Sequence, residues 1–398
     1  VRFEKAIEDV IADYRTIVGK WKRPFENGWD HAEFEVLFAT ATRNVKQDAG
    51  LGFPWRLYGS HNSDIIGGYY CELKEAVAER IQAILSTNFW DYNGFELIER
   101  NLTDPDRYFA KNQANPARKG RTPRTIASSS LTNQIVLRIF FDKFAEEEGD
   151  AYPNLCTKKG IGFDRMHAEK IGSQFESNTL KYGRPPVVSD VKGWESSFSD
   201  DLAYATTRVI ESTCSNPGIE LDRALLWWKH VLFANLGYLD DGTLIEFKER
   251  KVQRSGNFLT TSSNGIGRSV CARYCGSVPF CCGDDCNEWP TVPNDELMKI
   301  YKSIGLTLRD VSESDGISYD FCSHTFRKVQ GEWVCWLSAW ERMLFSTSVE
   351  KKYDYGSNLN WISEIYDMPD LVLRKRIMDY IERRTVILTT LSEYEESK

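Results

Sequence analysis

The sequence contains no apolar run as long as the ~18 residues that a membrane-spanning helix requires, so we expect no integral membrane segment. Its N-terminus has no signal-peptide pattern, because residues 1–5 begin an amphipathic helix instead. From the start at Val1 we expect a processed or trimmed product. The sequence also lacks internal repeats, low-complexity segments and a flexible interdomain linker. These absences exclude transmembrane and repeat proteins and favour one continuous folded assembly.

Hydrophobic residues make up 41% of the 398 residues, with 12 Trp, 18 Tyr and 21 Phe. A chain of this length and composition buries a substantial core, which excludes an intrinsically disordered protein. The net charge of −8 argues against a surface that is basic throughout. A local basic channel stays possible, because association with nucleic acid depends on the distribution of charge and not on its sum.

The 10 cysteines predict free thiols and not a disulfide framework, because the chain carries no secretory features. Five of them cluster, and this cluster raises structural zinc as an alternative. Their spacing matches no standard zinc pattern, so zinc is the weaker interpretation. The clustered cysteines are Cys271, Cys275, Cys281, Cys282 and Cys286.

An apolar run leads into Gly283-Asp284-Asp285, which predicts a tight hairpin turn because glycine tolerates the positive φ that such turns need. Adjacent carboxylates at a turn repel each other unless a cation neutralises them. The alternative is an ordinary solvated turn. Asp190 ends a predicted buried strand at 185–189 and precedes Asp284 by 284 − 190 = 94 residues. If it meets the turn, three carboxylates form a site suited to Mg²⁺.

Two further polar segments carry candidate binding groups. The strongest positive run lies within 111–138, where Pro116, Gly120 and Pro123 prevent a helix. Arginine forks there suit phosphate oxygens, and the alternative is a solvated surface loop. The loop at 255–264 leads into a helix and offers hydroxyls and amides to sugars and base edges. Its alternative is a polar helix cap.

Apolar periodicity predicts most of the remaining elements. The expected helices cover residues 1–20, 31–45, 73–85, 128–144, 221–233 and 295–303. Strands are expected at 243–247 and 306–308, and a strand or tight hairpin at 319–326. Asp200 and Asp201 follow Ser199 at an expected helix start, where they act as capping groups and not metal ligands. From Trp333 to Lys398 the pattern is helical.

In their order along the chain, these segments resemble the motif series of a positive-strand RNA virus RNA-dependent RNA polymerase, most like the sobemovirus and polerovirus group. The resemblance covers residues 50–326. The first three palm motifs are similar to Asp-x-x-Gly-Trp-Glu at 190–195, Ser-Gly-x-x-x-Thr-x-x-x-Asn at 255–264 and Gly-Asp-Asp at 283–285. The fourth and fifth are similar to 304–307 and 321–323. The basic run resembles a fingers motif, and 50–55 resembles the loop where the template enters.

The resemblance implies an α/β right-hand polymerase fold with fingers, palm and thumb. The N-terminal extension and fingers would cover residues 1–180. The palm, an antiparallel sheet flanked by helices, would cover 181–328 with a fingers insertion around 215–250. A helical thumb would cover 329–398. The implied partners are an RNA template and nascent strand, nucleoside triphosphates, and other viral replication proteins or a genome-linked protein. The implied location is the host cell cytoplasm, in viral replication complexes.

The resemblance also implies a role for each matching residue. Asp190 and Asp284 would hold two Mg²⁺ ions, for which Mn²⁺ can substitute, and Asp285 would help to place them. The triphosphate would be neutralised by Arg118, Lys119, Arg121 and Arg124. The nucleotide and its ribose would be read by Glu195, Ser255, Gly256, Thr260 and Asn264. The primer grip would be Phe321, Cys322 and Ser323, and the template would enter past Gly52, Phe53 and Pro54.

The sequence departs from the family pattern at two positions. Glu195 stands where the family usually has Asp, so ribose discrimination is arranged differently, is less stringent, or does not involve this side chain. The fourth motif often supplies a lysine that protonates pyrophosphate, whereas here Leu308, Arg309 and Asp310 follow. Arginine is a poor proton donor, so that role is unassigned. Lys299 and Lys302 are expected to be exposed helix charges.

Two other functions fit parts of the pattern. A reverse transcriptase shares the acidic pair, but the Ser-Gly-x-x-x-Thr-x-x-x-Asn loop argues against it. So does Cys282, because reverse transcriptases favour an aromatic residue two positions before the acidic pair. A polymerase-like RNA-binding subunit without catalysis is the other alternative. All three carboxylates are present, and Mg²⁺-dependent nucleotide incorporation would discriminate it from a polymerase.

Overall fold

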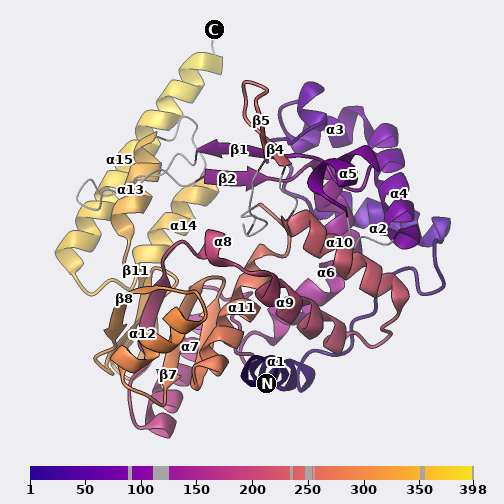
Figure 1. Cartoon of the computed structure of the whole chain (residues 1–398). Coiled ribbons are helices and arrows are strands. Elements are labelled where there is room, and N and C mark those ends of the chain that lie inside the picture. The colour runs from indigo at the N-terminus through magenta and orange to yellow at the C-terminus, as the bar shows by residue number, and fades with distance from the viewer. Residues whose placement is uncertain are drawn as a thin grey trace.

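The computed structural model of the chain describes residues 1–87, 92–110, 125–233, 236–246, 253, 256–349 and 355–396. Most of the N-terminal helices gather on one side and the C-terminal helices on the other, with a sheet-containing base between them (Figure 1). Within the described residues, no helix is long and apolar enough to cross a membrane. All 10 cysteines are free thiols.

The base contains a four-stranded antiparallel sheet in the order β6-β7-β3-β8. β3 is internal because it pairs with β7 on one side and with β8 on the other. Along β3, Val187 and Val191 are buried whereas Val188 and Asp190 are half-buried, as expected when alternate side chains face opposite sides of a sheet. The strands are β3 (Val187–Val191), β6 (Ser277–Cys282), β7 (Asp285–Pro290) and β8 (Leu308–Glu313).

Helices cover one face of this sheet. α11 (Thr260–Tyr274) packs on β6, and both α9 (Asp200–Thr213) and α1 (Arg2–Arg15) pack on α11. The predicted helix start is confirmed, but the cap is Ser199, whose side chain accepts a hydrogen bond from the Leu202 N–H; Asp200 and Asp201, predicted as capping groups, lie in the first turn of α9 instead. α8 (Trp194–Ser197) follows β3, and α12 (Asn294–Ser303) precedes β8. Lys299 and Lys302 are exposed on α12, as expected.

Aromatic side chains fill the other face of the sheet. Phe280 of β6 contacts Phe175 of α7 (Arg165–Tyr182), with ring centroids 4.5 Å apart. Phe175 also stacks on Tyr319 of β9 (Ser318–Phe321), at 4.8 Å between centroids. This cluster holds α7 and the three-stranded sheet β11-β10-β9 against the hairpin formed by β6 and β7.

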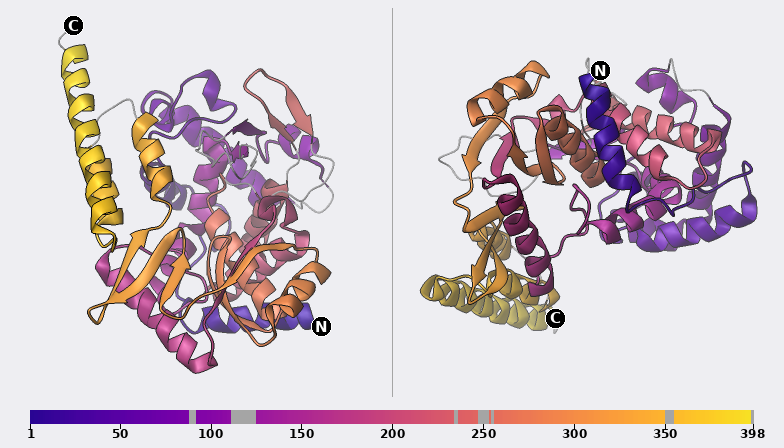
Figure 2. Two further views of the ribbon diagram at one scale, coloured as in Figure 1. Left: turned by 90° about the vertical axis from the view of Figure 1, so that its left-hand side faces the viewer. Right: turned by 90° about the horizontal axis from the view of Figure 1, so that it is seen from below.

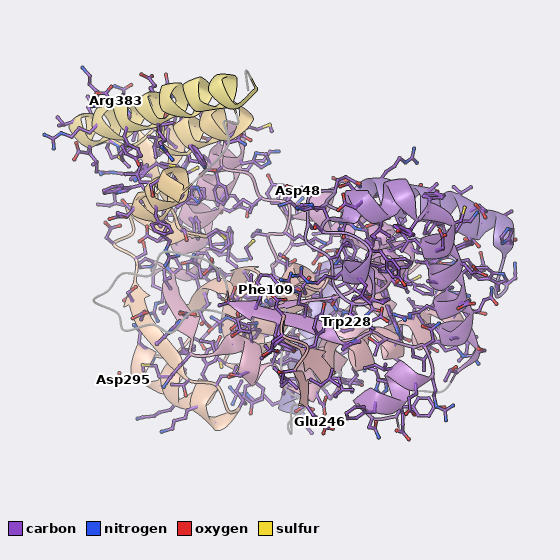
Figure 3. The ribbon with its side chains drawn as sticks, turned by 90° about the horizontal axis from the view of Figure 1, so that it is seen from above. Asp48, Phe109, Trp228, Glu246, Asp295 and Arg383 are labelled. Carbon is purple, nitrogen blue, oxygen red and sulfur yellow. The ribbon has the colours of Figure 1, made fainter. Side chains whose placement is uncertain are left out.

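The described parts of residues 31–151 and 219–246 form a second body, the N-terminal body, with helices around a mixed four-stranded sheet in which β1 pairs antiparallel with β2 and parallel with β4. Trp227 and Trp228 of α10 (Ile219–Phe233) are fully buried, and Figure 3 labels Trp228 within this body. Its strands are β1 (Asp106–Ala110), β2 (Thr125–Ser128), β4 (Leu236–Tyr238) and β5 (Leu244–Glu246). Its helices are α2 (His31–Asn44), η1 (Trp55–Leu57), α3 (Asn62–Gly68), α4 (Tyr70–Ser86), α5 (Gly94–Glu99), α6 (Leu131–Ala151) and α10 (Ile219–Phe233).

The C-terminal part begins with strands and not with a helix. β10 (His324–Val329) and β11 (Glu332–Leu337) form a hairpin, so the helix predicted from Trp333 is wrong up to Leu337. The boundary predicted between residues 328 and 329 falls inside this hairpin. Helices α13 (Trp340–Val349), α14 (Tyr355–Ile365) and α15 (Leu371–Glu396) follow, and α15 extends along the side of the molecule (Figure 2).

Other predicted bounds shift as well: the helix expected over residues 1–20 ends at Arg15, and two further shifts have an identifiable cause. The helix expected at 128–144 begins at Leu131, because Ser128 ends β2 and Ser130 caps the helix by accepting a hydrogen bond from the Asn133 N–H. The strand expected at 306–308 begins at Leu308, after Gly305 takes a positive φ of 83°. Both shifts follow from turn residues whose conformation interrupts the apolar pattern.

Candidate active site

The turn between β6 and β7 presents an acidic pair, and its geometry confirms the hairpin predicted from sequence. Cys282 pairs with Asp285, which leaves Gly283 and Asp284 as the two turn residues. Gly283 has a φ of 59°, the left-handed conformation that this turn position requires. A side chain on residue 283 would therefore strain the turn, although no other residue lies close to its Cβ position.

Asp190 lies on the neighbouring strand at the same end of the sheet. Ser189 pairs with Cys286, and the same antiparallel register continued by one residue places Asp190 opposite Asp285. The pKa of Asp285 is raised to about 6, first by loss of hydration within the protein and then by the negative charges of Asp284 and Asp190. The three carboxylates predicted to form one site are therefore electrostatic neighbours.

A guanidinium occupies part of this negative field. Arg309 of β8 contacts Asp190 Oδ2 through Nε at 2.6 Å and through Nη2 at 2.5 Å. Within the described residues, no three His, Cys, Asp or Glu side chains lie close enough together to hold a metal ion. From the sequence, Arg309 is recognised only as a poor proton donor, and its contact with Asp190 is not predicted.

A second arginine lies beneath the strand. Arg268 of α11 is fully buried, and its Nη2 donates to the Ser189 hydroxyl at 3.0 Å. Its positive charge lowers the pKa of Asp285, against the larger effects that raise it. Loss of hydration raises the pKa of the buried Glu288, which accepts a hydrogen bond from the Tyr301 hydroxyl at 3.1 Å. Sequence reasoning missed Arg268, although it lies one helical turn after Asn264.

The predicted primer-grip residues form a tight turn beside the acidic pair. Phe321 pairs with His324, so Cys322 and Ser323 are the turn residues, with φ values of 51° and 62°. Few non-glycine residues adopt this conformation. The Cys322 side chain favours the charged form of Asp285 and lowers the pKa of that carboxyl group, against the larger opposing effects. The structure thus places the turn directly against one of the candidate metal ligands.

The predicted ribose-binding residues lie around the start of α11. Asn264 is buried on α11, one turn after Thr260, and Ser255 lies outside the described residues. Gly256 packs so closely on β2 that a Cβ would lie 2.3 Å from the Ala127 carbonyl oxygen. Glu195 is exposed on α8.

Gln253, which the sequence reading did not single out, connects these groups. Its N–H donates to the Glu195 carbonyl oxygen at 2.6 Å. Its side-chain Nε2 donates to Ser263 Oγ at 2.6 Å and to Asn264 Oδ1 at 2.7 Å. Gln253 is buried, and its Oε1 has no hydrogen-bond partner among the residues that the structure describes. It therefore links the segment after Asp190 to the start of α11.

A buried carboxylate anchors the start of α11 from below. Glu148 of α6 accepts hydrogen bonds from Ser262 Oγ at 2.6 Å and from the Tyr14 hydroxyl at 2.7 Å. Lys159 Nζ lies 3.3 Å from Glu148 and donates to Ser262 at 3.0 Å. The network joins α1, α6 and α11 at the edge of the candidate site.

The predicted triphosphate-binding residues, Arg118, Lys119, Arg121 and Arg124, lie outside the described residues. The described part of the same basic run includes Arg138 on α6. Its guanidinium lies 4.5 Å from the centroid of the Phe258 ring, within the loop that leads to α11. It also pairs with Asp142 at 3.1 Å.

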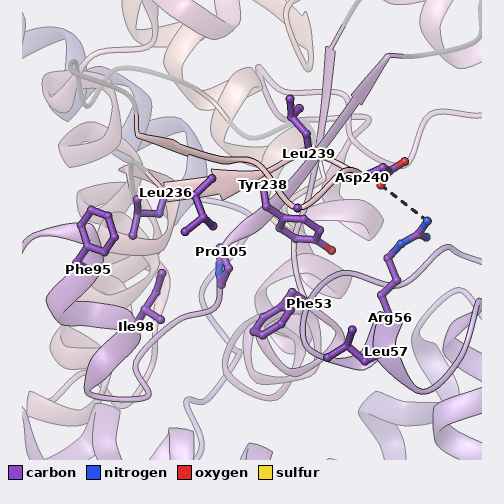
Figure 4. A pocket seen from close by; sticks show the side chains of 12 residues that line it. Phe53, Arg56, Leu57, Phe95, Ile98, Pro105, Leu236, Tyr238, Leu239 and Asp240 are labelled. Atoms are coloured by element: carbon purple, nitrogen blue, oxygen red, sulfur yellow. Dashed lines mark ion pairs between the residues drawn. The ribbon is translucent and has the colours of Figure 1, made fainter.

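Of the predicted template-entry residues Gly52, Phe53 and Pro54, Phe53 lines a pocket of about 540 Å³ in the N-terminal body (Figure 4). Phe53 is 40% exposed and lies edge-to-face with Tyr238, with ring centroids 6.2 Å apart. Arg56 pairs with Asp240 at the rim, at 3.8 Å. The peptide bond between Phe53 and Pro54 is cis. An aromatic surface with arginine at its edge suits unpaired bases.

The fold is that of viral RNA-dependent RNA polymerases. The structure is similar to a solved Sicinivirus 3Dpol RNA-dependent RNA polymerase, with a TM-score of 0.67 over 96% of this chain and 81% of that chain. The two sequences are 12% identical, so this likeness shows the fold alone. The predicted α/β right-hand polymerase fold is confirmed.

The predicted resemblance to sobemovirus and polerovirus replicases is also confirmed. The chain is 28% identical over 347 residues to the replicase polyprotein P2AB of Southern bean mosaic virus. This alignment covers 82% of the chain. The chain is 28% identical over 345 residues to protein P1-P2 of potato leafroll virus, which covers 81% of this chain. The matches span 35% and 31% of those two proteins. No family model matches the chain.

Proposed function

We propose that the chain is a viral RNA-directed RNA polymerase that extends an RNA 3′ end by template-directed nucleotidyl transfer. The observation that carries this proposal is the position of Asp190 opposite the hairpin of Asp284 and Asp285, within a polymerase fold. The name of the related Southern bean mosaic virus protein, a replicase polyprotein, supports it. The chain spans about a third of those relatives, so the proposal concerns this part of the replicase.

The donor set fits a hard divalent cation. Three carboxylates with a raised pKa at Asp285 form a negative site that a cation would neutralise. In the proposed enzyme, Asp190 and Asp284 hold Mg²⁺, for which Mn²⁺ can substitute, and Asp285 supports them. Bound Mg²⁺ would neutralise the triphosphate and lower the pKa of the attacking hydroxyl.

The protein groups around the carboxylates position the substrates. Arg268 holds the strand that carries Asp190, and the turn of Cys322 and Ser323 supports the primer end beside Asp285. Gln253 orients Asn264, which together with Thr260 and Ser255 reads the ribose. Such fixed positioning supplies much of the acceleration in phosphoryl transfer.

The remaining partners and boundaries belong to the same proposal. The basic residues Arg118, Lys119, Arg121 and Arg124 neutralise the triphosphate, and the template enters past Gly52, Phe53 and Pro54. Fingers, palm and thumb correspond to residues 1–180, 181–328 and 329–398, with a fingers insertion around 215–250. The enzyme works in replication complexes in the cytoplasm of the infected host cell, with other viral replication proteins or a genome-linked protein.

RNA extension on a homopolymer template tests the function. The parent is expected to incorporate ribonucleotides only with Mg²⁺ or Mn²⁺, and Asp284→Ala is expected to lose activity by a factor on the order of 10³ or more. The matched control is Asp295→Ala on α12, which removes an exposed carboxylate and should retain full activity. Equal activity in the parent and Asp284→Ala, or incorporation of deoxynucleotides on RNA at the same rate, would contradict the proposal.

A further inference from the structure

We infer that Arg309 is a positioning residue whose guanidinium binds Asp190 until a divalent cation displaces it. The strength of this contact thereby sets the metal concentration that the enzyme needs. The inference rests on the proposed function, because it assumes that Asp190 is a metal ligand. It assigns a role to a residue at the position where the family's fourth motif often has a lysine. In this role the guanidinium and a metal ion exchange at the Asp190 carboxylate, and no proton is transferred.

The contact is short and engages one oxygen of the carboxylate. Both Nε and Nη2 of Arg309 approach Asp190 Oδ2, at 2.6 and 2.5 Å. Hard divalent cations bind the same carboxylate oxygens. A cation that approaches Asp190 therefore has to displace the guanidinium from Oδ2 or bind a carboxylate whose charge is already partly neutralised. Arg309 must weaken metal binding by either route.

The backbone places Arg309 for this contact. β3 and β8 are in register at Asp190 and Arg309, but their pairing shifts between Val188 and Asp190. Directly opposed residues of an antiparallel pair project to the same face of the sheet. Asp310, the next residue, has a φ of 52°, which few non-glycine residues adopt. An irregular backbone thus surrounds a contact between two charged groups at the candidate site.

A purely structural role explains this contact less well. The side chains of Arg309 and Asp190 are 38% and 40% exposed, and ion pairs that open to water contribute little to stability. The two strands are already joined by their backbone pairing. At the opposite end of β8 from Arg309, Glu313 pairs with Arg184 at 3.0 Å, and Arg184 also donates to the Pro290 and Val292 carbonyl oxygens.

The charges around Asp190 also bear on the finding that no three potential metal-ligating side chains lie close together in the described residues. Asp284 and Asp285 repel Asp190, and the guanidinium attracts it. Arginine stays protonated at every pH of interest, so the guanidinium cannot act as the proton donor that a lysine would be. It remains a full positive charge after it leaves Asp190. Exchange of arginine for metal therefore keeps the acidic site neutralised at each stage.

Direct binding of Mn²⁺ without RNA or nucleotide tests the inference. Electron paramagnetic resonance measures the concentration of free Mn²⁺ during titration of each protein, which gives the affinity for Mn²⁺. The proteins are the parent and the variants Arg309→Gln, Arg309→Lys and Arg184→Gln. Arg309→Gln is expected to bind Mn²⁺ about 3- to 10-fold more tightly, the factor of a half-exposed, charge-assisted contact. Arg309→Lys keeps the competing charge and should stay near the parent. Arg184→Gln removes an arginine that pairs with Glu313 at the opposite end of β8, and it should leave the affinity for Mn²⁺ unchanged.

Three results would overturn the inference: unchanged or weaker binding in Arg309→Gln, equal tightening in Arg309→Lys, or equal tightening in Arg184→Gln. Thermal melting of each variant checks that it is folded, and Arg309→Met, which also removes the charge and should tighten binding by a similar factor, covers the case in which glutamine disturbs the fold. RNA extension by the parent and by Asp284→Ala separates the two proposals. If extension needs Asp284 while Arg309→Gln binds Mn²⁺ like the parent, only the role of Arg309 fails. If the parent neither binds Mn²⁺ saturably nor extends RNA, the proposed function fails.

Discussion

At the scale of single residues, charge placement decides how the candidate site behaves. Asp190, Asp284 and Asp285 share one end of the sheet, and their repulsion contributes to the raised pKa of Asp285. Arg309 and Arg268 oppose that repulsion from outside and from beneath the sheet. Such a site is poised to accept a cation, because a cation relieves repulsion that folding leaves in place.

Lys158 shows how a buried charge affects stability with pH. Burial lowers the pKa of the Lys158 ammonium to about 8, although it donates to the Leu155 carbonyl oxygen at 2.6 Å. Between about pH 8 and the ordinary lysine pKa, the unfolded chain binds more protons than the folded chain, so the free energy of unfolding rises with pH.

We therefore expect the free energy of unfolding of the parent to rise relative to Lys158→Met, with a slope approaching about 1.4 kcal/mol per pH unit across that range. Urea unfolding of both proteins at several pH values from about 7 to 10 measures the slope. The same pH dependence in both proteins would show that Lys158 keeps its ordinary pKa in the fold.

Local sequence patterns predicted the residues whose role depends on near neighbours. Gly283 is identified by the turn it must make, and Asp190 by the end of a buried strand. Arg309, Arg268 and Gln253 were missed because their partners are distant in the sequence. The contact of Arg309 with Asp190 depends on a register shift that no periodic pattern encodes.

At the scale of elements, packing of α7 against β11 fixes the start of the C-terminal part. Trp333 lies directly over Gly172, where a Cβ would be 2.2 Å from its ring. Gly172→Ala is expected to destabilise the protein by about 1–3 kcal/mol, the range for overpacking a closed contact. The measurement is the urea midpoint, followed by the fluorescence of the tryptophans.

The matched control for this change is Gly149→Ala on α6, where nothing lies near the new Cβ. Alanine favours a helix over glycine by up to about 1 kcal/mol, so this variant should be as stable as the parent or more stable. Equal stability of Gly172→Ala and Gly149→Ala would refute the close packing of Trp333 on α7.

The same contact explains why the helix predicted from Trp333 is wrong. Trp333, Trp336 and Trp340 have helical spacing, but Trp333 and Trp336 belong to a strand that pairs with β10. Burial of Trp333 against α7 and pairing of its backbone outweigh the apparent period. The amphipathic helix at the N-terminus and the hairpin at Gly283 were predicted because no distant partner competes with their local pattern.

At the scale of the whole molecule, α1 ties the N-terminal end of the chain to the candidate site. Tyr14 is fully buried and contacts both Glu148 and Thr157, each at 2.7 Å. Thr157 bridges to Cys281, next to the acidic turn, and Glu148 holds the start of α11. The stability of the site therefore depends on a helix that is distant in the sequence. Tyr14 precedes Asp190 by 190 − 14 = 176 residues.

Tyr14→Ala is expected to lower the free energy of unfolding by about 3–5 kcal/mol, and Tyr14→Phe by about 1–3 kcal/mol, because phenylalanine keeps the ring and loses only the hydrogen bonds. Hydrogen exchange should accelerate in α11 and in the hairpin of β6 and β7 for the alanine variant. Acceleration confined to α1 would show that the two ends of the molecule unfold independently.

The C-terminal helices and the N-terminal body lie on different sides of the molecule. Arg383 lies on α15 at the outer C-terminal side, across the molecule from the N-terminal body that contains Asp48 (Figure 3). The right-hand arrangement itself was predictable from the order of the motifs. The positions of the arms were not, because they depend on contacts such as Arg165 with Asp367, at 2.9 Å, that join residues about 200 positions apart.

Metal-directed cleavage of the backbone tests the central claim most directly. Fe²⁺ bound in place of Mg²⁺ is oxidised to Fe³⁺ by added hydrogen peroxide, which is reduced to hydroxide and a hydroxyl radical, and the radical cuts the nearby chain. The account predicts cuts near Asp190 and near Asp284 in the parent, both suppressed by excess Mg²⁺ and both reduced in Asp190→Asn. Cuts near only one of these residues, or cuts that Asp190→Asn leaves unchanged, would show that the strand and the hairpin do not form one metal site.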